Sequence, residues 1–150
     1  MPLVVDASVA LKWVLPEPDS ALAEALLVSG ETLLMPDFWL GEGANVLWVN
    51  VRRGLLTPEK ARQGLTVLQY QVEPTPTTGL ALHAAALEIG MAVNHSTYDT
   101  LYVAFALAMG ARGLVVADAP FVRAMRRHPD PALAALLIPL DEWAAGQRLA

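Results

Sequence analysis

The sequence contains no cysteine, and this absence removes several kinds of site at once. Disulfide bonds, thiolate zinc sites and cysteine nucleophiles are all excluded. A chain without disulfides fits a reducing compartment, so a cytoplasmic location is expected. The three histidines do not occur at the spacing of metal ligands.

Long apolar runs are also missing, although 55% of the residues are hydrophobic. The best candidate for a membrane span, residues 101–111, is far shorter than the roughly 20 residues required, and it indicates a buried helix instead. The N-terminus has no basic region of the signal-peptide kind, and Asp6 and Lys12 interrupt its apolar run. No association with a membrane is expected.

Charge is sparse, at 17% of the residues, and the net charge is −5. This balance argues against bulk non-specific binding to nucleic acid, but it does not exclude a nuclease. Two local clusters of basic residues are candidates for contacts with phosphate groups, and solvated helix ends explain them equally well. The clusters are Arg52 with Arg53, and Arg123 with Arg126, Arg127 and His128.

The chain has no repeat, no low-complexity tract and no long linker, so one domain is expected over residues 1–150. Short strand-like segments alternate with helical patterns, which predicts an α/β sandwich with a mostly parallel central sheet. The expected strands lie near 3–5, 32–35, 72–73, 113–117 and 136–139, and the expected helices near 7–14, 20–29, 37–53, 57–71, 78–90, 96–109 and 118–128.

Two acidic residues stand at the carboxyl ends of expected strands, where parallel α/β sheets bind their ligands. Asp6 follows the first strand, and Asp118 ends the VVAD segment, which we expect to lie beside it. Each also begins a helix, so a simple N-cap is the alternative explanation for either one. Asp37 is expected to cap the long helix in the same way.

Two further acids occur in apolar helices that are expected to be largely buried. Glu42 lies in PDFWLGEGANVLWVNV with Asn45 one turn later, and Asp99 is the only charge in residues 96–111. An unpaired carboxylate in such surroundings would be strongly unfavourable. Hydrogen bonds from serine, threonine or backbone groups are the alternative to a functional role.

A shared divalent cation would satisfy several of these acids together, because the ten basic residues cluster mostly elsewhere. All-oxygen ligands favour Mg²⁺ or Mn²⁺ over zinc. Such a site supports phosphoryl transfer by activating water, without a protein nucleophile. Ser8 is expected to hydrogen-bond a carboxylate or metal-bound water, or else only to start a helix. His95 is expected to be a cap or surface residue, and His83 to lie in the core.

At these residues the sequence resembles a known family. The segments VVDASVALKW, E-x-x-N at Glu42 and Asn45, TYDTLYVAFA and VVADAPFV occur in this order along nearly the whole chain. They resemble the PIN-domain ribonucleases, especially the VapC-type toxins of toxin–antitoxin pairs. The resemblance implies a three-layer α/β/α sandwich with a mostly parallel sheet of about five short strands, and a Mg²⁺- or Mn²⁺-dependent endoribonuclease acting on RNA.

The resemblance also implies the residues of the site and its partners. The catalytic and metal-binding acids would be Asp6, Glu42, Asp99 and Asp118, with Ser8 and Asn45 as supporting polar residues. A homodimer is implied, together with an antitoxin whose C-terminal segment blocks the acidic cleft. One departure from the family is that Val116 stands where Ser or Thr is common, which removes a possible hydrogen bond to a metal ligand.

Three other interpretations remain open. The first is a PIN-type nuclease of RNA processing with no toxin role. The second is a PIN fold kept for binding metal or RNA without catalysis, for which Val116 is the only sign. The third is a phosphate- or metal-sensing module like a response-regulator receiver. That module needs a lysine at a late strand end, whereas the lysines here, Lys12 and Lys60, do not follow strands.

Overall fold

The centre of the molecule is a five-stranded parallel sheet with the strand order β3-β2-β1-β4-β5. The computed structural model describes residues 1–148. The strands are β1 (Leu3–Val5), β2 (Leu33–Pro36), β3 (Pro74–Thr75), β4 (Gly113–Val116) and β5 (Leu137–Pro139). The expected α/β fold with about five short strands is confirmed, and the sheet is parallel throughout this part of the chain.

The two central strands, β1 and β4, are buried along their whole length. Both are rich in valine and leucine, as expected for parallel strands that are covered on both faces. Their register pairs Leu3 with Gly113 and Val5 with Val115, so the carboxyl ends of the two strands lie together. A Cβ atom at Gly113 would collide with the side chain of Ile138, and the glycine therefore allows β5 to approach.

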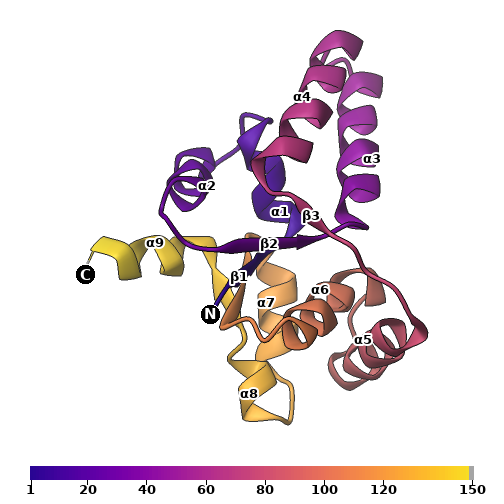
Figure 1. Cartoon of the computed structure of the whole chain (residues 1–150), viewed down its shortest axis with the longest axis vertical. Coiled ribbons are helices and arrows are strands. Elements are labelled where there is room, and N and C mark those ends of the chain that lie inside the picture. Colours follow the sequence, from indigo (N-terminus) through magenta and orange to yellow (C-terminus); the bar gives the residue numbers. More distant parts are fainter. Residues whose placement is uncertain (149–150) are drawn as a thin grey trace.

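Helices cover both faces of the sheet and give three layers. In Figure 1, α5, α6 and α7 lie below β2, whereas α1, α2, α3 and α4 lie above it. Helix α6 packs on β1 and β4, and α9 packs on β4, β5 and α2. The helices are α1 (Ala7–Ala10), continued by the 3-10 turn η1 (Leu11–Trp13), α2 (Ser20–Leu27), α3 (Trp39–Arg52), α4 (Pro58–Gln71), α5 (Leu80–Val93), α6 (Thr97–Ala108), α7 (Ala119–Arg126), α8 (Pro131–Ala134) and α9 (Leu140–Arg148). None of the helices in residues 1–148 has the length and apolar character that crossing a membrane requires.

Several element boundaries differ from the sequence-based expectation. The long helix starts at Trp39 rather than Asp37, because Asp37 does not cap it: its Oδ1 accepts a hydrogen bond from the Thr77 hydroxyl, 2.5 Å away. The third strand lies at 74–75 instead of 72–73. Helices α8 and α9 were not predicted. Helix α8 is a single turn that depends on Asp130, whose Oδ1 accepts from the Ala132 N–H.

The long helix α3 is less buried than its composition suggested. Its buried residues are Trp39, Gly43 and Leu47, which form one stripe at intervals of four residues. Glu42 and Asn45 are exposed, so the expectation of a largely buried setting for Glu42 was wrong. The reason is that α3 and α4 pack together as a hairpin that extends away from the sheet, visible at the top of Figure 1.

Candidate active site

Asp6 lies at the carboxyl end of β1 and is only 5% exposed. Its N–H donates to the carbonyl oxygen of Val115 (3.0 Å), which extends the β1–β4 ladder by one residue. Its Oδ2 accepts hydrogen bonds from the Ser8 N–H (3.1 Å) and the Ser8 hydroxyl (2.6 Å). Asp6 therefore does cap α1, as the simpler explanation required, and the same side chain is held rigidly at the strand end.

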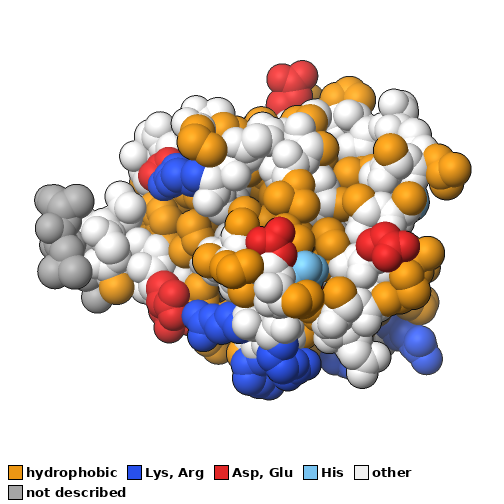
Figure 2. All heavy atoms as spheres, turned by 90° about the horizontal axis from the view of Figure 1, so that it is seen from below, with side chains coloured by type: hydrophobic (Ala, Val, Ile, Leu, Met, Phe, Trp, Pro, Cys, Tyr) orange, Lys and Arg blue, Asp and Glu red, His pale blue; other side chains and the backbone are white. Residues whose placement is uncertain are grey.

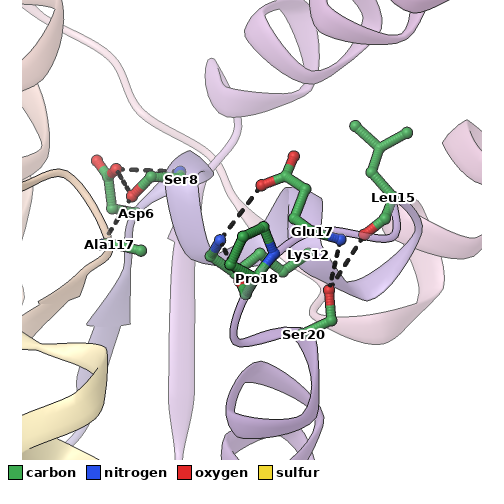
Figure 3. Close-up of polar contacts among 8 residues, drawn as sticks. All are labelled: Asp6, Ser8, Lys12, Leu15, Glu17, Pro18, Ser20 and Ala117. Atoms are coloured by element: carbon green, nitrogen blue, oxygen red, sulfur yellow. Dashed lines mark hydrogen bonds and ion pairs between the residues drawn. The ribbon is translucent and has the colours of Figure 1, made fainter. Parts of the chain in front are cut away.

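Ser8 joins the ends of the two central strands. Its hydroxyl donates to Asp6 and accepts from the Ala117 N–H at 3.0 Å (Figure 3). This bond connects the Asp6 turn with the residue that precedes Asp118. Lys12 follows on the same segment, but its Nζ donates to the Pro18 carbonyl oxygen (2.7 Å) and the Glu17 carboxylate (3.3 Å), on the other side of α1 from Asp6 (Figure 3).

Glu42 is connected to α6 through a buried tyrosine. The Tyr102 hydroxyl donates to Glu42 Oε1 at 3.0 Å. The Tyr102 ring is fully buried and packs edge-on against Phe38, with 5.3 Å between the ring centroids. Burial, and secondarily the Glu42 carboxylate, raise the pKa of Tyr102, so the phenol keeps its proton and remains a donor. The first turn of α3 is thereby fixed to the middle of α6.

Asp99 lies in the first turn of α6 and is held by a histidine from the preceding turn. His95 Nε2 is 2.7 Å from Asp99 Oδ2, and both side chains are partly buried. The His95 ring stacks on Phe121 of α7, with 5.0 Å between centroids and an interplanar angle of 10°. A Cβ atom at Gly90 would lie 3.0 Å from the His95 carbonyl oxygen, so the glycine allows this turn to pack closely on α5.

The charges of Glu42 and Asp99 act on Asp6, and the charge of Asp99 acts on Glu42. Burial is the main factor that raises the pKa of Asp6, to about 7, and the charges of Glu42 and Asp99 raise it further against the effect of the Ser8 hydrogen bonds. Glu42 is exposed as a whole residue, but its carboxylate loses hydration where it meets the buried Tyr102. This desolvation raises the pKa of Glu42 against the Tyr102 hydrogen bond, and the charge of Asp99 adds to the increase. Three acids from β1, α3 and α6 are therefore brought into one negatively charged region.

Asp118 is placed differently from the other three acids. Its Oδ1 accepts from the Phe121 N–H at 3.2 Å and caps α7, and its charge is not among those that raise the pKa of Asp6 or Glu42. It lines a separate cleft of about 500 Å³, which we call the Asp118 cleft. The charged side chains of this cleft are Lys12, Asp19, Asp118, Arg123, Arg126, Asp141 and Glu142.

The remaining residues expected at the site are distributed unevenly. Arg123 and Arg126 line the Asp118 cleft, and Arg126 pairs with Glu142 at 3.1 Å. Arg52 and Arg53 lie at the other end of α3, about 15 Å along the helix from Glu42. The Arg52 guanidinium instead lies over the Trp48 ring, 5.6 Å from its centroid. Among residues 1–148, no hydrogen bond joins Asn45 to any of the four acids.

The oxygen donors at this edge have the chemistry that Mg²⁺ or Mn²⁺ prefers. Asp6, Glu42 and Asp99 each use one carboxylate oxygen in a hydrogen bond, and no donor in residues 1–148 contacts the second oxygen. Within the same range, no three His, Asp or Glu side chains already lie close enough to enclose a metal ion. The chemistry of these oxygen donors fits a divalent cation, although the side chains of residues 1–148 are not gathered around a single point.

Two residues that hold the acids were missed by the sequence analysis. His95 precedes Asp99 by four residues, which is the spacing of neighbours on a helix. This spacing was the signal from which the pair could have been predicted. Tyr102 gave no such signal, because its partner Glu42 is 60 positions away. His83 was expected in the core but is exposed, with Nδ1 3.3 Å from the Gly79 carbonyl oxygen.

Comparisons with known proteins identify the family of this chain. The PIN domain family matches residues 3–126. Ribonuclease VapC3 of Pyrobaculum aerophilum is 34% identical over 121 residues, covering 77% of this chain and 89% of that protein.

Two crystal structures share the fold at 17% sequence identity. PAE2754 from Pyrobaculum aerophilum has a TM-score of 0.70 and aligns with 100% of this chain and 91% of its own. VapBC2 from Rickettsia felis, bound to a DNA fragment from its promoter, has a TM-score of 0.65, with 93% and 98% covered. The resemblance to VapC-type ribonucleases is confirmed, and the chain belongs to the PIN domain family.

Proposed function

We propose that this chain is a Mg²⁺- or Mn²⁺-dependent endoribonuclease, formed by one domain and acting as the toxin of a VapBC-type pair. The observation that carries the proposal is the group of three acids, Asp6, Glu42 and Asp99, at the carboxyl edge of a parallel sheet, where burial and, to a smaller extent, neighbouring acid charges raise the pKa of Asp6 and Glu42. The relative named a ribonuclease supports the reaction class.

The three acids bind the cation, and their neighbours keep them oriented. Ser8, Tyr102 and His95 each donate to one carboxylate oxygen and leave the other for the ion. When bound, Mg²⁺ or Mn²⁺ supplies an activated water and neutralises charge on the RNA phosphate. Asp118 lies beyond the Ala117 N–H that binds Ser8, and we assign it a supporting role at the same edge.

The proposed partners are RNA, a second copy of the chain and an antitoxin. The solved VapBC2 complex supports the antitoxin, and the VapC resemblance implies both protein partners. Hydrophobic side chains are spread over the face formed by α5, α6 and α7, and basic ones gather along one edge of it (Figure 2). Leu80, Leu87 and Met91 of α5 are at least half exposed and offer an apolar surface for the homodimer.

Cleavage of RNA by purified Asp6→Asn and Asp99→Asn chains tests the proposal. With Mn²⁺ present, we expect the rate to fall at least about 10³-fold, because each substitution removes a metal ligand rather than one hydrogen-bond donor. Asparagine keeps an oxygen for the Ser8 or His95 donor and is a good cap, so both variants should fold.

Asp130→Asn is the matched control, since Asp130 also caps a helix but precedes β5, away from the acidic edge. It should cleave like the unmodified chain. Cleavage at the unmodified rate by both the Asp6 and Asp99 variants would refute the proposal. If cleavage behaves as expected, the genomic neighbourhood separates the two biological roles: a short adjacent gene for a DNA-binding protein indicates a toxin, and a solitary gene indicates RNA processing.

A further inference from the structure

A second cleft opens beside Glu42, and its lining differs from that of the Asp118 cleft. It has a volume of about 590 Å³, within the range of small-molecule sites. We call it the Glu42 cleft. Its lining side chains are Phe38, Glu42, Thr77, His83, Tyr98 and Leu101. Because Glu42 belongs both to this cleft and to the acidic group, whatever the cleft binds lies next to the reacting phosphate.

Tyr98 is the most conspicuous residue of the lining. It directly precedes Asp99 at the start of α6 and is 79% exposed. No residue in the described part of the chain hydrogen-bonds its hydroxyl, and no aromatic ring there pairs with it. A flat, exposed aromatic side chain beside a nuclease site is the kind of surface on which nucleobases stack.

The charge of the Glu42 cleft excludes a phosphate as its occupant. The lining residues given above include one acid, Glu42, and no lysine or arginine. The Thr77 hydroxyl gives its hydrogen to Asp37, so it presents only lone pairs to a ligand. Glu42 Oε2 is likewise an acceptor. The Tyr98 hydroxyl and the His83 ring, which also line the cleft, can donate as well as accept. An aromatic cleft with one carboxylate and several polar groups of this kind suits a neutral, flat group that carries both N–H donors and acceptors, and unpaired nucleobases have these properties.

We propose that the Glu42 cleft binds an unpaired base of the RNA, adjacent to the scissile phosphate, with the base stacked on Tyr98. The inference rests on the proposed ribonuclease function and adds a substrate requirement to it. RNA whose base next to the cut is free to leave its helix is recognised, and a phosphate backbone without bases is not.

The test measures binding in a chain that does not cleave. Asp6→Asn is titrated with 5′-labelled hexaadenylate and with the same ribose-phosphate backbone lacking its bases, and the dissociation constants are read by fluorescence anisotropy. Adding Tyr98→Ala should weaken binding of hexaadenylate about tenfold or more and leave the abasic strand unaffected. Tyr98→Phe should preserve binding, because stacking uses the ring.

Tyr70→Ala is the matched control, since Tyr70 is 85% exposed on α4 and does not line the cleft. The proposal is wrong if Tyr98→Ala leaves the preference for intact RNA unchanged, or if Tyr70→Ala reduces it equally. It is also wrong if Tyr98→Ala weakens only the complex with an antitoxin, since the occupant is then a protein segment. If the unmodified chain prefers intact RNA over the abasic strand but does not cleave RNA with Mn²⁺ present, the ribonuclease proposal alone is refuted.

Discussion

The Asp118 cleft and the Glu42 cleft have similar sizes but opposite chemistry. The Asp118 cleft contains basic and acidic side chains, among them Arg123 and Arg126. The Glu42 cleft is lined mainly by aromatic and aliphatic groups, with one acid, one threonine and one histidine. Asp6 is not among the residues that line either cleft. The Ser8 hydroxyl connects it with the Asp118 segment, because it donates to Asp6 and accepts from the Ala117 N–H. We propose that the two clefts have different roles, with phosphates bound on the side of Arg123 and Arg126 and bases bound on the side of Tyr98.

The four acids of the family pattern divide in the same way. Glu42 and Asp99 act on the pKa of Asp6, and Asp118 does not. Helix capping accounts for the Asp118 hydrogen bond, through its contact with the Phe121 N–H. Four residues that are equivalent in a sequence motif are therefore unequal in the structure, and substitution should expose the inequality.

The largest expected effect is the contrast between Asp99→Asn and Asp118→Asn. Loss of Asp99 should reduce RNA cleavage at least about 10³-fold, since a metal ligand is removed. Loss of Asp118 should reduce it only about 10–100-fold, the range for residues that support metal ligands. Single-turnover cleavage with saturating Mn²⁺ measures both. Equal reductions would mean that Asp118 binds the metal as directly as Asp99 does, and that the two acids do not have different roles in catalysis.

Stability gives the next largest effect, through Asp6. Its pKa is raised from 3.8 to about 7 by burial and by the neighbouring acids, so the folded chain keeps a proton that the unfolded chain releases. Without metal, this group should lower the free energy of unfolding as the pH rises from about 4 to about 7, and the full penalty persists above that range. Asp6→Asn should therefore stabilise the metal-free chain at pH 8, by about 4 kcal/mol at most.

Urea unfolding in EDTA at pH 5 and pH 8 measures this effect. Asp118→Asn is the control and should leave stability nearly unchanged, because asparagine caps helices as well as aspartate. Added Mn²⁺ should stabilise the unmodified chain at pH 8 more than Asp6→Asn, since the cation offsets the cost of burying the Asp6 charge beside other acids only where the carboxylate is present. If Asp6→Asn is less stable than the unmodified chain, capping of α1 by the Asp6 carboxylate contributes more to stability than its buried charge costs.

These expectations show what the sequence could and could not provide. The parallel sheet and the positions of Asp6 and Asp118 followed from strand–helix alternation, because short apolar runs and caps are local signals. The Tyr102–Glu42 bond joins residues 60 positions apart and depends on how α3 packs against α6, which no local pattern encodes. The sequence also raised the question of whether Val116, which stands where Ser or Thr is common, removes a hydrogen bond to a metal ligand.

Packing explains the error at the long helix and describes the surroundings of Val116. An apolar composition suggested that α3 was buried all round, but its partner α4 covers only part of it and Trp48 remains 54% exposed. Val116 is fully buried in β4, so a hydroxyl is not needed for packing there. The hydroxyl that connects β4 with Asp6 comes instead from Ser8, through the Ala117 N–H.

The smallest expected effect distinguishes the two arginine clusters. In the Asp6→Asn background, Arg123→Gln with Arg126→Gln should weaken RNA binding and reduce the slope of log affinity against log salt by about 0.7 for each phosphate that is no longer neutralised. The matched pair, Arg52→Gln with Arg53→Gln, should leave the slope unchanged, because these residues lie at the far end of α3 and Arg52 covers Trp48. The Arg126–Glu142 pair is exposed, so its removal should affect folding little. Equal slopes for both double variants would assign phosphate binding to neither cleft, and the arginine side would then differ from the aromatic side in composition but not in function.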